Sequence, residues 1–157
     1  MKISSLKTIG MGVLFTVVCV SARASVVEGA GNWKGTGASF AIDGEKIADF
    51  AVQLTNTKVD DHTLLTSGSV TLADGSVRSF SQTMKDGLNG FSLESAEGTG
   101  GGHCFGAGLC ESYMDLGNGH GVAVTEIFDG SSDMRLLAIT IENGKGTGFT
   151  RENIHRY

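Results

Sequence analysis

Hydrophobic and polar residues alternate along most of the chain, which is the pattern of half-buried β-strands. Over Asp49–Thr55, one face carries Phe50, Val52 and Leu54, and the other face carries polar or small residues. The same alternation recurs over Val77–Met84. Further shared faces are formed by Val122, Val124 and Phe128, and by Leu137, Ile139 and Ile141. The chain beyond residue 24 has almost no apolar residues at helical spacing, so we predict an all-β protein.

Short turns separate these alternating runs. Asn-Gly and Asp-Gly pairs are preferred in two-residue hairpin turns, because both central positions need a positive φ. Such pairs fall between candidate strands at Asp43-Gly44, Asp74-Gly75, Asp86-Gly87, Asn118-Gly119, Asp129-Gly130 and Asn143-Gly144. Consecutive strands joined by such short loops are antiparallel neighbours.

The candidate strands define the predicted architecture. They lie near 32–42, 46–56, 63–73, 76–84, 90–96, 102–105, 109–116, 120–128, 134–142 and 147–154. The two ranges around the cysteines can be counted as one hairpin, so we expect eight or nine strands. A meander of this length leaves no exposed edge if it closes, and we therefore predict an antiparallel up-and-down β-barrel. An open β-sandwich is the alternative.

The N-terminal segment has the three-part layout of a secretory signal peptide. Met1–Lys7 carries two lysines and no acid, Thr8–Val20 is almost continuously apolar, and small residues at Ala22 and Ala24 suit a cut after Ala24. We therefore predict a signal peptide at 1–24 and a single exported β-barrel domain at 25–157, in the periplasm or outside the cell. A retained anchor or a buried helix is the alternative.

Export changes the charge of the working domain. The whole chain carries 12 basic and 17 acidic residues and a formal net charge of −5. Three of the basic residues and none of the acids lie in residues 1–24, so the remainder carries a charge of −8. This balance argues against nucleic acid and anionic membranes as partners, since both require clustered Lys and Arg. No second apolar stretch reaches the length of a membrane span.

Cysteine usage fits an oxidising compartment. Cys19 lies in the predicted signal peptide, which leaves Cys104 and Cys110 as an even pair. The five residues between them form a plausible turn, and we predict a structural disulfide. A redox pair or a set of metal ligands is the alternative, although the spacing is not the C-x-x-C of a thioredoxin-like dithiol.

The single tryptophan carries a family resemblance. The segment Gly31-Asn32-Trp33-Lys34-Gly35-Thr36-Gly37 resembles the opening motif of the calycin barrels, which include the lipocalins and the nitrobindin-like proteins. The resemblance implies that Trp33 closes one end of the barrel and that a basic residue of the last strand, Arg151 or Arg156, packs across the indole. It also implies ligand binding inside the barrel, and a haem held by His155 as a further alternative.

Two residues are candidates for ligand binding, Glu126 and His103. If its strand alternates regularly, Glu126 shares the inward face with Val122, Val124 and Phe128. A lone buried charge is costly, so this carboxylate would need a partner such as Arg135 or Arg151. A buried ion pair, a hydrated barrel mouth and a local shift of the strand register are the open alternatives.

His103 lies beside Cys104 in a glycine-rich region. With Glu111 and Asp115 on the returning strand it could form a loose metal or acid–base cluster, while the simpler interpretation is a solvent-facing side chain.

Motifs for catalysis and cofactors are missing. There is no G-x-S-x-G, the histidines show no metal spacing, and the glycines of 98–102 lack the Lys-Ser/Thr of a P-loop. We therefore predict no catalytic residue, no cofactor and no metal.

Three functions remain as hypotheses. The preferred one is non-covalent binding of a small apolar or amphipathic molecule in the barrel. The second is a protein-interaction or inhibitor module with a solid barrel. The third is a hydrolase or isomerase, which requires His103, Glu126 and a third polar group to converge on one cleft. The partner is thus a small ligand or a protein, and the oligomeric state is left open.

Overall fold

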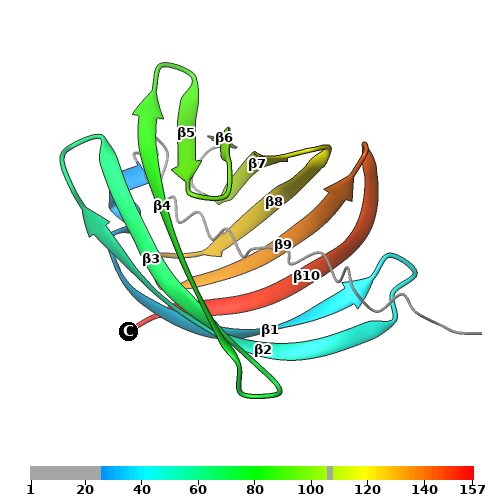
Figure 1. Cartoon of the computed structure of the whole chain (residues 1–157). Coiled ribbons are helices and arrows are strands. Elements are labelled where there is room, and N and C mark those ends of the chain that lie inside the picture. The colour runs from blue at the N-terminus through cyan, green and yellow to red at the C-terminus, as the bar shows by residue number, and fades with distance from the viewer. Residues whose placement is uncertain (1–25, 106–107) are drawn as a thin grey trace, which may run out of the picture.

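Ten antiparallel strands form one closed barrel (Figure 1). The computed structural model describes residues 26–105 and 108–157, so the predicted signal peptide lies outside the described residues. Each strand pairs with its neighbours in sequence, and β1 also pairs with β10. The elements are η1 (Val26–Gly29), β1 (Gly31–Ala41), β2 (Lys46–Lys58), β3 (Thr63–Leu72), β4 (Val77–Gly87), β5 (Gly90–Ser95), β6 (Thr99–Phe105), β7 (Leu109–Gly117), β8 (His120–Asp129), β9 (Asp133–Glu142) and β10 (Lys145–Arg156).

The predicted class, an all-β antiparallel up-and-down barrel, is confirmed, but the predicted count of eight or nine strands is wrong. The two ranges around the cysteines are separate strands, because β6 also pairs with β5 and β7 also pairs with β8. The prediction counted these two ranges as one unit, so its number of strands was too low. Among the described residues, no helix combines the length and apolar character that a membrane span needs.

Most of the predicted turns occur where the sequence places them. Asn118-Gly119 and Asn143-Gly144 have positive φ at both residues, as two-residue hairpin turns require. The exception is Asp86-Gly87, which belongs to β4, and the turn to β5 is formed by Leu88 and Asn89. Asp86 instead points inward and accepts a hydrogen bond from the backbone N–H of Val26 at 2.9 Å.

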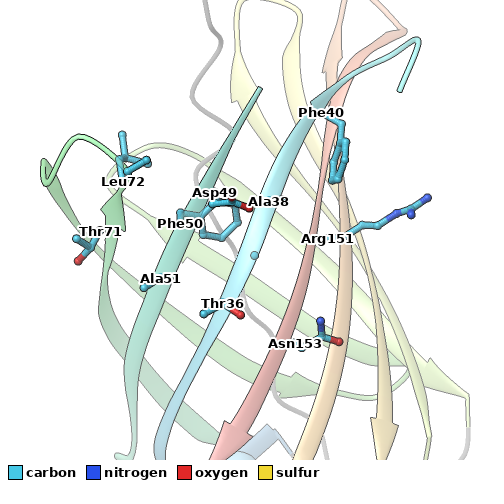
Figure 2. Close-up of a pocket in the computed structure, with 12 residues that line it drawn as sticks. Thr36, Ala38, Phe40, Asp49, Phe50, Ala51, Thr71, Leu72, Arg151 and Asn153 are labelled. Atoms are coloured by element: carbon cyan, nitrogen blue, oxygen red, sulfur yellow. The ribbon is translucent and has the colours of Figure 1, made fainter. Parts of the chain in front are cut away.

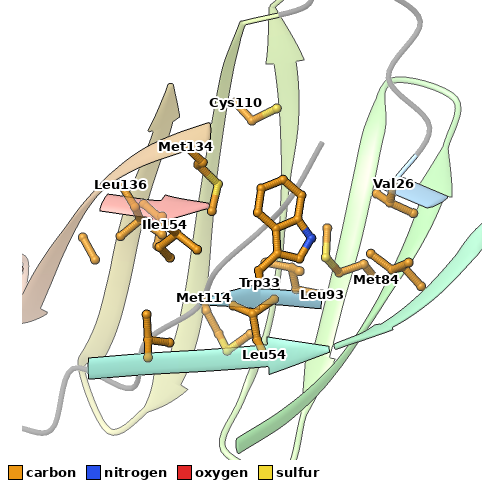
Figure 3. Close-up of a cluster of buried hydrophobic side chains, with 14 of the residues drawn as sticks. Val26, Trp33, Leu54, Met84, Leu93, Cys110, Met114, Met134, Leu136 and Ile154 are labelled. Carbon is orange, nitrogen blue, oxygen red and sulfur yellow. The ribbon is translucent and has the colours of Figure 1, made fainter. Parts of the chain in front are cut away.

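The hydrophobic core is concentrated at the end of the barrel that η1 covers. Trp33 lies at its centre, fully buried, with methionine and aliphatic side chains from the surrounding strands packed around it (Figure 3). The cluster includes Val26, Leu54, Leu64, Met84, Leu93, Met114, Met134, Leu136 and Ile154. A fully buried aromatic ring of this size contributes more to the stability of a core than most smaller side chains do.

Hydrogen bonds hold η1 over this end of the barrel. The backbone carbonyl of Gly29 accepts from Trp33 Nε1 at 3.2 Å and from Asn56 Nδ2 at 3.0 Å. The Arg156 guanidinium lies 5.9 Å from the Trp33 ring and donates to the carbonyl of Ala30. Of the two arginines that the resemblance implied, Arg156 is therefore the one beside the indole. Arg151 lies on the outer face.

Glycine in β1 permits the close approach of β10. A Cβ on Gly35 would lie within 2.8 Å of the Ile154 Cα and closer still to the carbonyl of Asn153. No side chain fits between these backbones, so glycine at this position allows the last strand to pack against the first.

Substitution of Trp33 tests how much its buried indole stabilises the end of the barrel that η1 covers. We expect Trp33→Ala to lower the free energy of unfolding by about 3–5 kcal/mol, because it leaves a large cavity and removes a hydrogen bond. Urea titration followed by far-UV circular dichroism measures the change. Ile47→Ala, at a side chain that is 48% exposed, should cost less than about 0.5 kcal/mol. Equal effects at the two positions would contradict the placement of Trp33 in the core.

Candidate functional site

Two glutamates project into the barrel from strands on either side of β9. Glu126 on β8 and Glu152 on β10 are both 1% exposed, and both are Cα partners of Leu136. They are therefore two strands apart, about 10 Å between Cα atoms. We call Glu126 and Glu152 the inner carboxyl pair. Within the described part of the chain, they are the only buried side chains that ionise.

Glu152 is held between β1, β2 and β9. Its Cα partner on β1 is Gly37, whose own partner on β2 is Phe50. A Cβ on Gly37 would lie 2.5 Å from Phe50 Cζ and 2.7 Å from Glu152 Cγ. The missing side chain thus makes room for the phenylalanine ring and the glutamate side chain to lie over the same stretch of β1.

Burial governs the ionisation of Glu152. The loss of water raises the pKa of Glu152 from 4.5 to about 8, against a smaller lowering by a hydrogen bond from Thr150. That bond joins Thr150 Oγ1 to Glu152 Oε1 at 3.4 Å, which is long for a hydroxyl donor. Glu152 Oε2 has no hydrogen-bond partner among the described residues. Near neutral pH the side chain is mostly a neutral carboxylic acid in an apolar wall.

Glu126 faces inward as its alternation with Val124 and Phe128 indicates. The two arginines considered as its partners lie elsewhere. Arg135 is on the outer face, where its Nε is 3.1 Å from a carboxylate oxygen of Asp129. Arg151 is also on the outer face, with its guanidinium over two phenylalanine rings. Of the alternatives for Glu126, a buried ion pair with Arg135 or Arg151 is therefore not formed.

A second buried polar group crosses β2, β3 and β4. Asn56, Thr66 and Gln82 are successive Cα partners, and none is more than 3% exposed. Asn56 uses its Nδ2 to hold η1, while its Oδ1 and the Thr66 hydroxyl have no partner in the residues that the structure covers. Buried polar atoms normally find a partner, so this wall also offers groups to a polar molecule inside the barrel.

An open groove of about 600 Å³ lies on the outer face of β10, β1, β2 and β3 (Figure 2). The rings of Phe40 and Phe149 stack with centroids 4.9 Å apart, and the Arg151 guanidinium lies 5.7 Å and 5.3 Å from them. Phe40 and Arg151 border one side of the groove, and Thr71 borders the other. Gly37 and Phe50, which flank Glu152 inside the barrel, also contribute to its lining.

The structure separates His103 from Glu126. His103 is exposed on β6, on the side of the wall opposite to the inward Cys104, and its ring contacts Phe105 with centroids 4.4 Å apart. His103 and Glu126 therefore do not converge on one cleft. In the described residues, no group of three His, Cys, Asp or Glu side chains is arranged to hold a metal ion. The alternative of a cluster of His103 with Glu111 and Asp115 is therefore not formed, and His103 is exposed, as the simpler interpretation predicts.

The remaining sequence candidates lie near the ends of the barrel. Cys104 and Cys110 are Cα partners on β6 and β7, and their sulfurs form a disulfide. His155 is exposed on β10 and has Lys34 and Asp133 as its strand partners, so it does not face the barrel interior. A haem inside the barrel could not be held by this histidine.

Glu152, Asn56 and Thr66 are buried polar residues that the sequence pattern does not single out. For Asn56 a signal was present, because it continues the inward series of Phe50, Val52 and Leu54 by one more step. Glu152 gave no such signal, since polar residues stand on both faces of β10 around it.

Comparison with known proteins shows the fold. No protein-family model and no curated protein matches the chain. A protein of unknown function of the DUF3598 family from Nostoc punctiforme is similar over 83% of this chain and 48% of its own length, with a TM-score of 0.65 and 12% identity. The chain thus spans about half of that protein. The S-type phycobiliprotein lyase CPES from Guillardia theta is similar over 83% of this chain and 89% of its own, with a TM-score of 0.63 and 14% identity. These likenesses and the closed antiparallel sheet show a shared barrel fold and no more.

The raised pKa of Glu152 predicts how stability changes with pH. The unfolded chain releases this proton near pH 4.5 and the folded chain near pH 8. The folded state therefore binds more protons in this window, and raising the pH through it lowers the free energy of unfolding, by about 5 kcal/mol at most. Urea titrations across the window should show this loss in the wild type and a much smaller one in Glu152→Gln. The exposed Glu94→Gln serves as the matched control, and a wild-type slope retained in Glu152→Gln would refute the assignment.

Proposed function

We propose that this chain is an exported protein that binds a small amphipathic molecule inside its barrel, with Glu152 contacting the polar group of that molecule. The observation that carries the proposal is that Glu152 Oε2, in a carboxyl group that is 1% exposed, has no hydrogen-bond partner among residues 26–105 and 108–157. An unsatisfied buried polar atom costs about 1–3 kcal/mol, and a ligand that supplies the missing partner recovers this energy.

The surroundings of Glu152 suit a molecule with one polar and one apolar part. Phe50 and Leu136 are buried beside it, and Asn56 and Thr66 offer further oxygens at the η1 end. A neutral carboxylic acid can donate a hydrogen bond from one oxygen and accept one at the other. The calycin-like barrel fold is compatible with this use of the interior.

Displacement of a fluorescent dye tests the proposal. The neutral dye N-phenylnaphthylamine should gain fluorescence on binding the purified protein, and octanol should displace it. In Glu152→Leu, octanol should lose about tenfold in affinity relative to the dye, because its hydroxyl loses a hydrogen-bond partner. Glu94→Leu, at an exposed position, should behave as the wild type. Absence of dye binding to the wild-type protein would overturn the proposal.

A second candidate function, recognition of a partner protein, is favoured by the outer face. Tyr113, Ala123, Ile139, Phe149 and Phe40 are successive Cα partners across β7, β8, β9, β10 and β1. This row of apolar side chains ends at the groove that contains Arg151. Phe40→Ala separates the two candidates, because it should leave interior binding of the dye unchanged. Loss of dye binding in this variant alone would place the dye in the outer groove instead.

Export is part of the proposal and has its own test. A disulfide between Cys104 and Cys110 suits an oxidising compartment, and residues 1–24 have the layout of a cleaved signal. When the whole chain is expressed in a secreting bacterial host, the intact mass of the protein recovered outside the cytoplasm should correspond to a chain beginning at Ser25. Ala24→Leu should block this cut. A mass that begins at Met1 in the wild type would contradict cleavage.

A further inference from the structure

Large aliphatic side chains line the outer face of β9. Leu137, Ile139 and Ile141 alternate with the buried residues of this strand and point away from the barrel. We call these three residues the β9 ridge. The helical element of the described residues, η1, packs against β2, β3 and β4 and leaves the ridge uncovered. An uncovered apolar surface of this kind marks a place where another molecule binds.

The neighbouring strand β8 presents small side chains beside the ridge. Thr125 and Ala123 are the Cα partners of Leu137 and Ile139. We call the shallow strip over Ala123 and Thr125 the β8 trough. The ring of Tyr113 closes one end of this strip, where it lies over the outward glycine of β8. A tall row and a low row of side chains therefore run next to each other along the wall.

An acid and a base flank these two strands. Glu111 on β7 is the Cα partner of Thr125, and Arg151 on β10 is the Cα partner of Leu137. The Arg151 guanidinium is positioned by the Phe149 ring, 5.3 Å from its centroid. Both charged side chains are exposed, and within the described part of the chain neither forms an ion pair. The wall thus carries one charge of each sign that is available to another molecule.

This surface is complementary to itself. In Figure 1, β7, β8, β9 and β10 follow one another around the wall. A two-fold axis parallel to the strands and between β8 and β9 places β8 of one chain opposite β9 of a second copy. The ridge of each chain then lies in the trough of the other. The same axis places β7 opposite β10, so Glu111 faces Arg151 of the second copy, twice in each dimer.

We propose that the chain forms a homodimer through the outer face of β7–β10, with the β9 ridge in the β8 trough and Glu111 paired with Arg151 of the second copy. The inference rests on the second candidate function, whose partner it names, and is independent of binding inside the barrel. Burial of the ridge supplies affinity, while the two ion pairs fix the orientation. Any other partner would have to supply a matching ridge, trough and pair of charges, which a second copy already has.

The size of the contact sets the concentration at which the dimer forms. Four strands about 4.8 Å apart, over about seven residues each, cover roughly 400 Å² per chain. This is a small interface, so the dimer exchanges with the monomer. In sedimentation velocity of the purified protein, the average mass should rise from one chain towards two between about 1 μM and about 1 mM. A single-chain mass over this whole range would overturn the inference.

Charge reversal tests the arrangement. Glu111→Arg and Arg151→Glu each place like charges opposite one another at both contacts, and each should weaken the dimer at least tenfold. An equimolar mixture of the two variants should associate again, because every contact in the mixed dimer joins opposite charges. The double variant Glu111→Arg/Arg151→Glu should associate as the wild type does. Glu94→Arg, an equal change of charge at an exposed position on β5, should have little effect.

The ridge has its own variant. Leu137→Asp places a charge in the centre of the contact and should weaken the dimer at least tenfold, whereas Ile47→Asp, at an exposed aliphatic residue of β2, should not. Far-UV circular dichroism checks that the variants are folded. A dimer that ignores both charge reversals, or single variants that fail to associate when mixed, would overturn the two-fold arrangement. Dye binding is measured separately, so these outcomes leave the interior site standing, and loss of dye binding leaves the dimer standing.

Discussion

The pairing of β1 with β10 is the contact on which the rest of the structure depends. It joins nine residue pairs, from Trp33 opposite Arg156 to Ala41 opposite Gly148, and it turns a ten-strand sheet with two edges into a barrel with none. Three features lie along this seam: the sealed end at Trp33, the inward Glu152 opposite Gly37, and the outer aromatic pair of Phe40 and Phe149. Weakening the seam would therefore disturb the core, the candidate ligand site and the outer groove together.

The strands could be predicted from the sequence because the information for them is local. Alternation and turn residues act over a few positions, and each of the ten predicted ranges overlaps an observed strand. Alternation does not say which of the two faces of a strand points into the barrel. Leu137, Ile139 and Ile141 read as one apolar side of a strand, yet they lie on the outer face, while Leu136 and Ala138 point into the barrel. Only the closed sheet decides which of two apolar faces is inside.

The candidate site shows the same division. Glu126 could be predicted to face inward, because apolar residues on both sides of it share its register. Its position relative to Glu152 could not be predicted, since the two glutamates lie on β8 and β10 and are related only through their shared partner strand β9. His103 follows a run of glycines, so no alternation of apolar residues indicates which way its side chain points. Its outward direction is known only from the pairing of β6 with β7. Of the inner carboxyl pair, Glu126 could therefore be predicted from the sequence and Glu152 could not. The second predicted ligand-binding residue, His103, lies on the surface.

The closing contact also has a consequence for the order in which the chain folds. Every other strand pair joins neighbours in sequence and can form as soon as its hairpin exists, whereas Arg156 and Ala30 are 126 residues apart. Closure of so long a loop is entropically expensive and slow compared with hairpin formation. During folding, one edge of β1 therefore stays unpaired until β10 has formed and reached it. This exposed edge is the point at which an incompletely folded chain would associate with another copy of itself.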